Sequence, residues 1–251
     1  MSGHSKWSTI KHQKEANDKA RGQAFSKLSR AITVAVREGG GETDPEANYK
    51  LRVAIDRARG VNMPKSNIQR AIDRALGGEE EVRLESIRFE GYAPFGVGVI
   101  IEAITDNRQR TVQEIKNLIE KGGGSIASPG SVSYNFMPKG QVILNKIASV
   151  EDQMLAIMDI DGVEDLFEEE EFLEVVTDKN RLSQVLADIE KAGFEIKSAS
   201  LVMVPKTEVP ITDPGKAQKV VNFVERLEDQ EDVQAVFANF DIPSKVLKQF
   251  S

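Results

Sequence analysis

Residues 79–104 read EEEVRLESIRFEGYAPFGVGVIIEAI, and the period of the hydrophobic pattern changes within this stretch. Ile87 and Phe89 alternate with charged neighbours, which indicates a strand with one buried face. Residues 97–104 are nearly all apolar, as in a strand covered on both faces. Upstream of the acidic run 79–81, apolar residues instead recur every three or four positions. The chain therefore changes at this run from a helical unit to one that contains β-strands.

Three amphipathic stripes upstream predict three helices, at about 16–38, 46–59 and 65–76. Glycines follow each stripe as stop signals, and Asp44-Pro45 offers an N-cap and a first residue for the second helix. Residues 16–78 are thus predicted to form a three-helix unit behind a basic arm of about 15 residues. The apolar positions of the stripes are Phe25, Leu28, Ile32 and Val36, then Leu51, Ala54, Ile55 and Ala58, then Ile68, Ala71, Ile72, Ala75 and Leu76.

Downstream of the strand at 97–104 the pattern predicts a helix and a further strand. A helical stripe begins at Val112, with Thr111 and Glu114 as a capping box, and glycines 122–124 end it. Residues 131–136 then alternate as a strand. This series lacks one helix and one strand of a sheet that covers itself.

The missing parts occur far downstream, as a helix that opens at Asp213-Pro214 and an alternating strand at 233–237. The residues between are therefore an insertion, and their pattern is βαββαβ, the order of the ferredoxin-like fold. We accordingly predict an α+β protein in which the helical domain precedes two ferredoxin-like α+β modules, the third domain being inserted in the second. The predicted domains are 1–80, 81–136 with 206–243, and 137–205.

The net charge of −7 is unevenly distributed along the chain. Residues 1–76 hold 15 Lys and Arg against 8 Asp and Glu, and residues 77–251 hold 18 against 32. Such an asymmetry indicates a phosphate-rich partner at the basic end. We expect this partner to be nucleic acid, either DNA or ribosomal RNA, with the ribosome as a further candidate.

Composition excludes several classes of protein. The chain has no cysteine, which rules out a disulfide scaffold, a thiolate zinc site, an iron–sulfur cluster and a cysteine nucleophile. The longest apolar run, 97–101, is far shorter than the roughly 20 residues that span a bilayer, so we expect no membrane partner. The first seven residues have no apolar core, and we therefore expect no signal peptide and a cytoplasmic location.

The inventory for catalysis is small. The two histidines, His4 and His12, lack the further ligands of a metal site, and neither a phosphate-binding P-loop, a nucleophile elbow nor a dinucleotide fingerprint occurs. The acidic run 168–171 is typical of a solvated surface that discourages edge pairing. We expect a non-enzymatic protein with no catalytic residue, no metal, no cofactor and no small-molecule ligand.

The candidate nucleic-acid-binding residues lie mainly in the basic arm and the first helix. Trp7, the only tryptophan, lies among lysines, so it can stack on an exposed base while the ammonium groups meet phosphates. Trp7 can equally fold back as a packing anchor of the helical unit. The candidates in this region are His4, Lys6, Trp7, Lys11, His12, Lys14, Lys19, Arg21 and Lys27.

Two further candidates, Arg108 and Arg110, lie at the start of the helix in the second module. Two arginines beside a helix N-terminus suit a phosphate, but an internal pair between Asp106 and an arginine explains them equally well. The glycine-containing loops 122–125 and 129–131 can cradle an anion through backbone amides, although such glycines more often form turns. The helices at 46–59 and 65–76 suit a helix-turn-helix, as does any small three-helix bundle.

Short blocks along the whole chain resemble the signature blocks of the YebC family of bacterial proteins and their mitochondrial relatives. The blocks are Ser2-Gly-His-Ser-Lys-Trp7, Asp18-Lys-Ala-Arg-Gly22, Gly39-Gly-Gly41, Asn62-Met-Pro64, Glu90-Gly-Tyr92, Asp106-Asn-Arg108, Arg110-Thr111 and Gly130-Ser-Val132. The resemblance implies three domains, with the third inserted in the second, and no enzymatic activity. Ala93 and Phe95 stand where many members carry glycines, which affects the backbone freedom of that loop.

Many members of this family are named as probable transcriptional regulators that bind DNA, and others are similar to translation activators that act at the ribosome. The resemblance therefore implies a DNA-binding transcriptional regulator, with a ribosome-associated, RNA-binding translation factor as the alternative. Because phosphates supply most of the affinity for either polymer, the residues separate the two functions only weakly. An arm with one stacking aromatic and no clear recognition helix mildly favours structured RNA, whereas a dimer with a helix-turn-helix would favour DNA. A third class, an enzyme, is disfavoured by the missing catalytic site.

Overall fold

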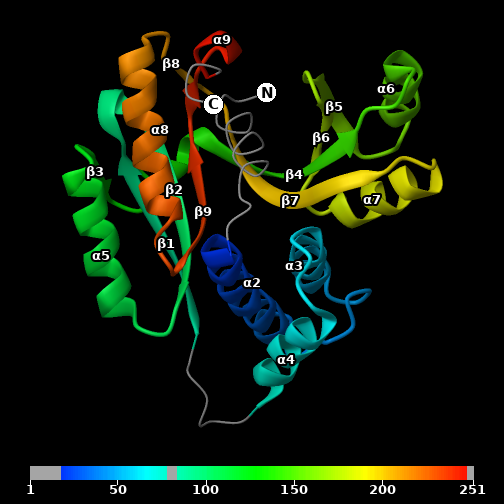
Figure 1. Cartoon of the computed structure of the whole chain (residues 1–251), viewed down its shortest axis with the longest axis horizontal. Coiled ribbons are helices and arrows are strands. Elements are labelled where there is room, and N and C mark those ends of the chain that lie inside the picture. Colours follow the sequence, from blue (N-terminus) through cyan, green and yellow to red (C-terminus); the bar gives the residue numbers. More distant parts are fainter. Residues whose placement is uncertain (1–17, 78–83, 248–251) are drawn as a thin grey trace.

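The computed structural model describes residues 18–77 and 84–247 of the 251-residue chain. Two four-stranded sheets lie side by side, and the helical unit lies below and between them in the view of Figure 1. Two helices pack against each sheet. The predicted α+β class, with a helical region followed by β-containing modules, is therefore confirmed.

The helical unit consists of α2 (Asp18–Glu38), α3 (Tyr49–Gly60) and α4 (Lys65–Leu76). The predicted apolar stripes meet in its core, where α3 and α4 both pack on α2. The prediction is wrong for Leu76, whose side chain is 58% exposed at the last position of α4. Residues 61–64 connect α3 to α4, with a turn at Val61 and Asn62, and Met63 of this connection packs into the core.

The helix α3 begins later than predicted. Its N-cap is Asn48, whose side-chain oxygen accepts the N–H of Leu51 at 3.1 Å, so the predicted start at Asp44-Pro45 is wrong. Asn48 is buried, and its amide nitrogen donates to the carbonyl of Ala35 on α2 at 2.9 Å. The N-cap of α3 is therefore determined by a contact between α2 and α3, which the local sequence does not indicate.

The second module is a sheet with the strand order β3-β1-β2-β9, in which all neighbours are antiparallel. Its elements are β1 (Glu85–Tyr92), β2 (Gly98–Thr105), α5 (Arg108–Lys121), β3 (Ser125–Ala127), α8 (Pro214–Glu228) and β9 (Val233–Ala238). Numbered along the chain, the strands of this module lie in the order 3-1-2-4 and its chain order is ββαβαβ, so it has the predicted α+β class but not the predicted ferredoxin-like topology, whose chain order is βαββαβ. The last helix and strand return to this sheet after the insertion, as the sequence predicts.

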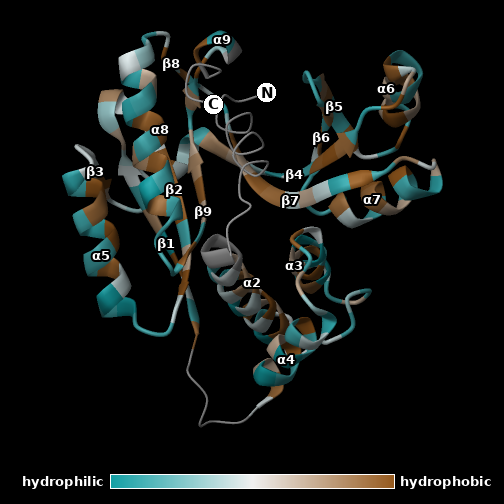
Figure 2. Cartoon of the chain, viewed as in Figure 1, coloured by the Kyte–Doolittle hydropathy of each residue, from teal (hydrophilic) through white to brown (hydrophobic). Residues whose placement is uncertain are grey.

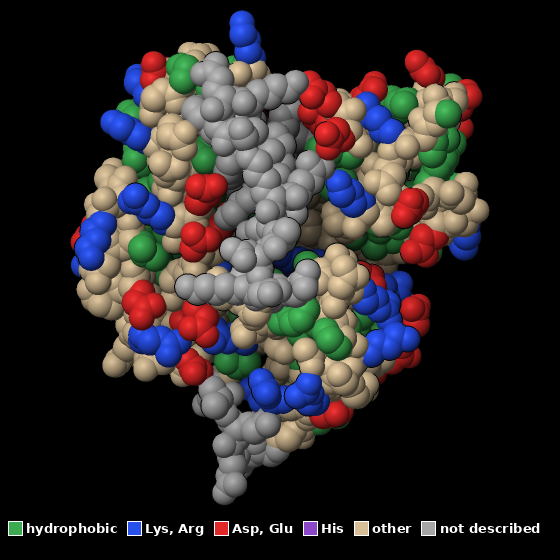
Figure 3. Space-filling model, in the orientation of Figure 1, with side chains coloured by type: hydrophobic (Ala, Val, Ile, Leu, Met, Phe, Trp, Pro, Cys, Tyr) green, Lys and Arg blue, Asp and Glu red, His purple; other side chains and the backbone are tan. Residues whose placement is uncertain are grey.

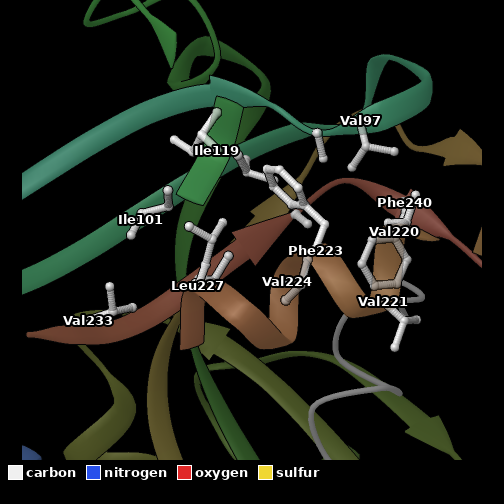
Figure 4. Close-up of a cluster of buried hydrophobic side chains, with 14 of the residues drawn as sticks. Val97, Ile101, Ile119, Val220, Val221, Phe223, Val224, Leu227, Val233 and Phe240 are labelled. Atoms are coloured by element: carbon white, nitrogen blue, oxygen red, sulfur yellow. The ribbon is translucent and has the colours of Figure 1, made fainter. Parts of the chain in front are cut away.

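Both helices of the second module cover one face of its sheet. Figure 4 shows Ile119 of α5 and Val224 and Leu227 of α8 directed toward Ile101 and Val233 of the sheet. The polar and apolar stripes on α5 and α8 in Figure 2 agree with this one-sided burial. No helix in the described part of the chain is both long enough and apolar enough to cross a membrane.

The third strand of this sheet is β3, and the predicted strand at 131–136 is wrong. Residues 133–135 form a short 3-10 helix, η2 (Ser133–Asn135), and the Tyr134 side chain is 71% exposed. Gly130 lies in the left-handed region, with φ of 89°, and turns the chain before η2. The alternating letters of this segment therefore reflect two buried residues, Val132 and Phe136, on either side of a turn.

The helix α5 also begins earlier than the predicted capping box. Asn107 is its N-cap and accepts the N–H of Arg110 at 3.1 Å. Thr111 consequently lies inside the helix, and its buried hydroxyl bonds Thr105 and Asp232 instead of capping. The predicted cap of Thr111 and Glu114 is wrong, because the Thr111 hydroxyl donates its hydrogen bond to Asp232, 121 residues away in the sequence.

The inserted module has the ferredoxin-like chain order βαββαβ and the strand order β5-β6-β4-β7, with antiparallel neighbours. Its elements are β4 (Phe136–Asn145), α6 (Val150–Met158), β5 (Val163–Glu168), β6 (Phe172–Asp178), α7 (Leu182–Lys191) and β7 (Ile196–Pro205). The helices α6 and α7 cover one face of the sheet, and Val53 of α3 joins the same core. The helical unit therefore contacts this module through α3.

A small apolar cluster joins the two sheets. Ile100 and Phe237 on the face of the second module away from its helices pack with Val132, Phe136 and Val202. The long strands β4 and β7 thus carry the insertion away from this point (Figure 1). The remaining short elements are η1 (Pro94–Gly96), β8 (Val209–Pro210), β10 (Phe240–Asp241) and α9 (Ser244–Leu247).

Candidate nucleic-acid interface

The described part of the chain contains five of the eleven predicted binding residues. Lys19 and Arg21 lie in the first turn of α2, and Lys27 lies farther along the same helix. Arg108 and Arg110 lie in the first turn of α5. The other six fall outside the described residues, and their binding role stays a prediction. They are His4, Lys6, Trp7, Lys11, His12 and Lys14.

Lys27 has a partner within the molecule. Its Nζ donates to the backbone carbonyl of Glu228 at the end of α8. One turn later, Arg30 donates to Asp232 at 2.6 Å and to the carboxylate of Glu231 at 2.7 Å. These contacts join α2 to the loop between α8 and β9. The structure therefore gives Lys27 a place in the contact between the helical unit and the second module.

Asp232 is the centre of this contact. Its side chain is 1% exposed and receives hydrogen bonds from Arg30, Arg110 and Thr111 at 2.6 to 2.9 Å. Burial alone would raise the pKa of Asp232, but the hydrogen bonds from Thr111 and Arg110 and the two positive charges lower it. The carboxylate is therefore held ionised beneath two guanidinium groups.

The two arginines at the start of α5 both face carboxylates. Arg110 donates to Asp106 and to Asp232, each at 2.9 Å, and these partners raise its pKa. Arg108 Nη1 lies 3.4 Å from Glu85 Oε2. The arrangement corresponds to the internal pairing that the sequence left open as the alternative to a phosphate site. A phosphate at this position would have to compete with Asp106 and Asp232.

The glycine-containing loops bind partners within the molecule. The amides of residues 122–124 donate to carbonyls of the last turns of α5, so they form the helix end. The loop at 129–133 does cradle an anion, namely the carboxylate of Glu90, which accepts the N–H groups of Gly130, Val132 and Ser133 at 2.7 to 2.8 Å. The loop therefore fixes β1 to the start of β4.

Exposed cations gather on the face of α3 and α4. Residues 49–76 hold seven Lys and Arg against two Asp and Glu. Figure 3 shows Lys and Arg side chains over α3 and α4, at the lower right of the molecule. Lys65, Arg70 and Arg74 are exposed and form no ion pair in the described chain, and Arg59 is exposed and pairs with Asp56. Burial lowers the pKa of Arg57, whose charge interacts with Glu102 of β2. The sequence signalled these residues only through the net charge of the basic half.

The two helices meet at an angle set by their turn. Asn62 in this turn lies in the left-handed region with φ of 58°, and the chain then enters α4 at Lys65. The apolar side of α4 packs on α2, so Lys65, Arg70 and Arg74 project from its outer side. The result is a two-helix element with a cationic outer surface and a supporting helix behind it.

The inserted module carries most of the acidic excess. Residues 137–205 hold 6 Lys and Arg against 15 Asp and Glu. The cations of α3 and α4 and the carboxylates of this module therefore belong to different parts of the molecule. An approaching polyanion is attracted to the first surface and repelled by the second.

Family comparisons cover almost the whole chain. The model of the TACO1/YebC protein N-terminal domain matches residues 5–78, and the model of the TACO1/YebC second and third domain matches residues 84–240. The chain belongs to the TACO1/YebC family. The resemblance seen in the sequence blocks is thereby confirmed.

Relatives of this YebC-family protein share its full length. A protein from Roseiflexus castenholzii is 46% identical over all of this chain and 99% of its own, and one from Thermotoga maritima is 44% identical over 99% and 97%. Both are named "Probable transcriptional regulatory protein". The family is thus one of regulators, a class that is not enzymatic in general.

A solved structure supports the fold of the YebC-family chain. The crystal structure of a conserved hypothetical protein from Aquifex aeolicus has a TM-score of 0.82 and 39% sequence identity, over 90% of this chain and 92% of that one.

Within residues 18–77 and 84–247, no group of three or more His, Cys, Asp or Glu side chains is arranged to hold a metal ion.

Proposed function

We propose that this YebC-family protein is a non-enzymatic, DNA-binding regulator of transcription that docks on duplex DNA through its basic arm and helical unit. The observation that carries this proposal is the exposed cationic surface of α3 and α4. This surface has an excess of basic residues, whereas the inserted module has an excess of acidic ones. Phosphate neutralisation by such cations supplies most of the affinity for nucleic acid. The role places the protein in the cytoplasm.

The shape of α4 supports duplex DNA as the target. A single α-helix fits the major groove, and α4 has 12 residues with its apolar side held on α2. Its outer side offers Lys65, Gln69 and Arg70. Arginine and lysine suit guanine and glutamine suits adenine, so this surface combines phosphate contacts with groups that read base edges.

The segregation of charge supports an oriented complex. The inserted module packs on α3 and holds more than twice as many acidic as basic residues, so it is expected to repel a bound nucleic acid toward α4. The second and inserted modules are then presented away from the DNA. We propose that a regulator of this shape positions those modules toward the transcription machinery.

The second candidate function is that of a ribosome-associated, RNA-binding translation factor. One observation favours it: Phe95 in the second module is 43% exposed beside a cationic groove, and an exposed aromatic ring suits an unpaired base. Duplex DNA offers no unpaired base to such a ring. The two functions therefore differ in the polymer that they require.

The experiment is sedimentation of a cell extract through a sucrose gradient at low and moderate salt, with and without DNase. If the protein acts on DNA, we expect it to sediment with material that DNase removes. A protein with Lys65→Gln, Arg70→Gln and Arg74→Gln is expected to stay at the top. Co-migration with ribosomes, insensitive to DNase and abolished in the same variant, would instead make translation the function.

A further inference from the structure

A second cationic surface lies on the second module, separate from the one on α3 and α4. A groove of about 500 Å³ separates the end of α5 from the middle of α8 and opens beside η1. Its charged lining residues are Lys121, Lys219 and Arg226, and no carboxylate lines it in the described chain. Figure 3 shows Lys and Arg side chains along this side, at the left over α5 and α8. The groove is therefore locally positive within a module that is acidic in total.

The three cations form no ion pair in the described chain, although Glu114 and Asp229 line an adjoining pocket together with Lys121 and Arg226. By contrast, Arg30, Arg108 and Arg110 all face carboxylates. The charge of the groove is consequently available to a ligand with negative groups.

An aromatic ring is held at the mouth of this groove in a strained position. Phe95 has φ of 67° and ψ of 21°, in the left-handed region, which a bulky residue rarely adopts. The hydrogen bond from the N–H of Ala93 to the carbonyl of Val97, 2.7 Å long, closes the loop around it. The ring is 43% exposed, so it does not serve mainly to fill the core. Strain of this kind gathers at binding sites, where the surrounding structure enforces it.

A cation already lies over this ring. Lys216 Nζ is 5.4 Å from the ring centroid of Phe95, and α8 carries Lys219 one turn farther. A base that stacks on Phe95 would thus have its phosphates beside ammonium groups of α8. Proteins that bind single strands combine an aromatic platform with cations along the backbone in this way.

We propose that the groove between α5 and α8 binds single-stranded RNA, with Phe95 stacking on an unpaired base and Lys121, Lys219 and Arg226 contacting the flanking phosphates. Asn222, also in the groove, accepts a hydrogen bond from Gln218 at 2.7 Å. This bond occupies the amide oxygen of Asn222 and leaves its NH₂ group as the donor, which suits a ribose 2′-hydroxyl. The site is separate from α3 and α4 and does not rest on the proposed binding of duplex DNA.

The test is the affinity of the full-length protein for a fluorescein-labelled oligo(U) RNA of about 12 nucleotides, measured by fluorescence anisotropy. Phe95→Leu keeps an apolar side chain but removes the stacking ring, and is expected to weaken binding roughly 5- to 100-fold. Phe95→Trp is expected to bind at least as tightly as the native protein. Tyr134→Leu, which removes an exposed aromatic ring outside the groove, is expected to leave the affinity unchanged.

One variant separates a binding role from a structural one. Phe95→Gly relieves the left-handed strain, so it is expected to keep or raise the melting temperature while it weakens RNA binding. The double variant Lys121→Gln/Lys219→Gln is expected to reduce the salt dependence by roughly 0.7 log unit for each phosphate that is no longer neutralised. Its matched control is Lys116→Gln/Lys179→Gln, two exposed lysines outside the groove.

Three results would overturn the assignment. RNA affinity that Phe95→Leu and Phe95→Gly leave unchanged removes the stacking role. Equal affinity for oligo(dT) of the same length removes the preference for RNA. Displacement of the RNA by a poly-glutamate peptide, with the same dependence on Phe95, assigns the groove to an acidic protein segment. Duplex DNA binding is measured in parallel, and its disappearance in the α4 variant alone would leave this inference standing.

Discussion

Arg30 of α2 donates a hydrogen bond of 2.6 Å to the buried carboxylate of Asp232, 202 residues away in the sequence. The same carboxylate accepts from Arg110 and Thr111 of α5. One residue thus joins the helical unit to the second module. The orientation of the cationic surface on α3 and α4 relative to the two sheets depends on this contact.

Substitution of Asp232 by alanine is expected to destabilise the protein by about 3 kcal/mol, because it leaves Arg110 and Arg30 without their buried partner. Arg30→Ala is expected to cost about 1 kcal/mol, since Arg110 and Thr111 still satisfy the carboxylate. Urea unfolding of both variants measures these decreases. Arg59→Ala, which removes an exposed pair within α3, is the control and should leave stability nearly unchanged. Equal decreases in all three variants would contradict the central place of Asp232.

The carboxylate of Glu90 makes stability depend on pH. Burial alone would raise the pKa of Glu90, but the N–H donors of Gly130, Ser133 and Val132 lower it below its ordinary value of 4.5. A lowered pKa in the folded state stabilises the protein above pH 4.5, and this stabilisation disappears as the pH falls through the folded pKa. Glu90→Gln is expected to cost about 2 kcal/mol at pH 7.

The control for this prediction is the same comparison of the two proteins at a lower pH. Unfolding of the native protein and of Glu90→Gln is compared at pH 7 and pH 3, and the difference between them should shrink at the lower pH. A difference that stays constant from pH 7 to pH 3 would show that the charge of Glu90 does not hold the loop at 129–133.

Gly124 is required by packing. A Cβ at this position would lie 2.4 Å from the carbonyl oxygen of Tyr92 and 2.9 Å from the ring of Phe223. Gly124→Ala is therefore expected to lower the free energy of unfolding by about 2 kcal/mol. Gly22 is the matched position, because a Cβ there meets no atom within 4 Å and the residue lies in α2. Gly22→Ala should raise helix stability by about 0.5 to 1 kcal/mol, and a similar decrease at both positions would refute the packing explanation.

The sequence predicted the layout of the fold for a physical reason. Amphipathic periods record which face of each element is buried, so the stripes of α2, α3 and α4 and the return of the chain at Asp213-Pro214 are visible in one dimension. Starts and turns were less visible. Asn48 caps α3 through a contact with α2, and residues 131–136 alternate without forming a strand. The predicted domain boundaries stay a prediction.

The candidate interface was only partly predictable. Net charge indicated the basic half, but it did not separate cations with internal partners from exposed ones. Lys27 and Arg110 bond residues more than a hundred positions away, whereas Arg70 and Arg74 project from α4. The groove beside Phe95 forms only when α5 and α8, distant in the sequence, pack side by side.

The lysines of the basic arm are expected to add phosphate contacts to those of the helical unit. Replacing Lys6, Lys11 and Lys14 by alanine should weaken DNA binding and reduce its salt dependence by roughly 0.9 log unit for each phosphate left without its cation. Anisotropy titrations of duplex DNA across a range of salt concentrations measure this slope. An unchanged slope would remove these three lysines from the interface.

The most direct test of docking through α3 and α4 is the same titration with the variant Lys65→Gln/Arg70→Gln/Arg74→Gln, on a duplex DNA of about 20 base pairs. Its control is Lys179→Gln/Lys191→Gln/Lys197→Gln, which removes three exposed charges from the inserted module. We expect weaker binding and a smaller salt slope, by up to about 0.9 log unit per residue, in the first variant and native behaviour in the second. Native affinity and slope in the first variant, or equal decreases in both, would contradict docking through α3 and α4.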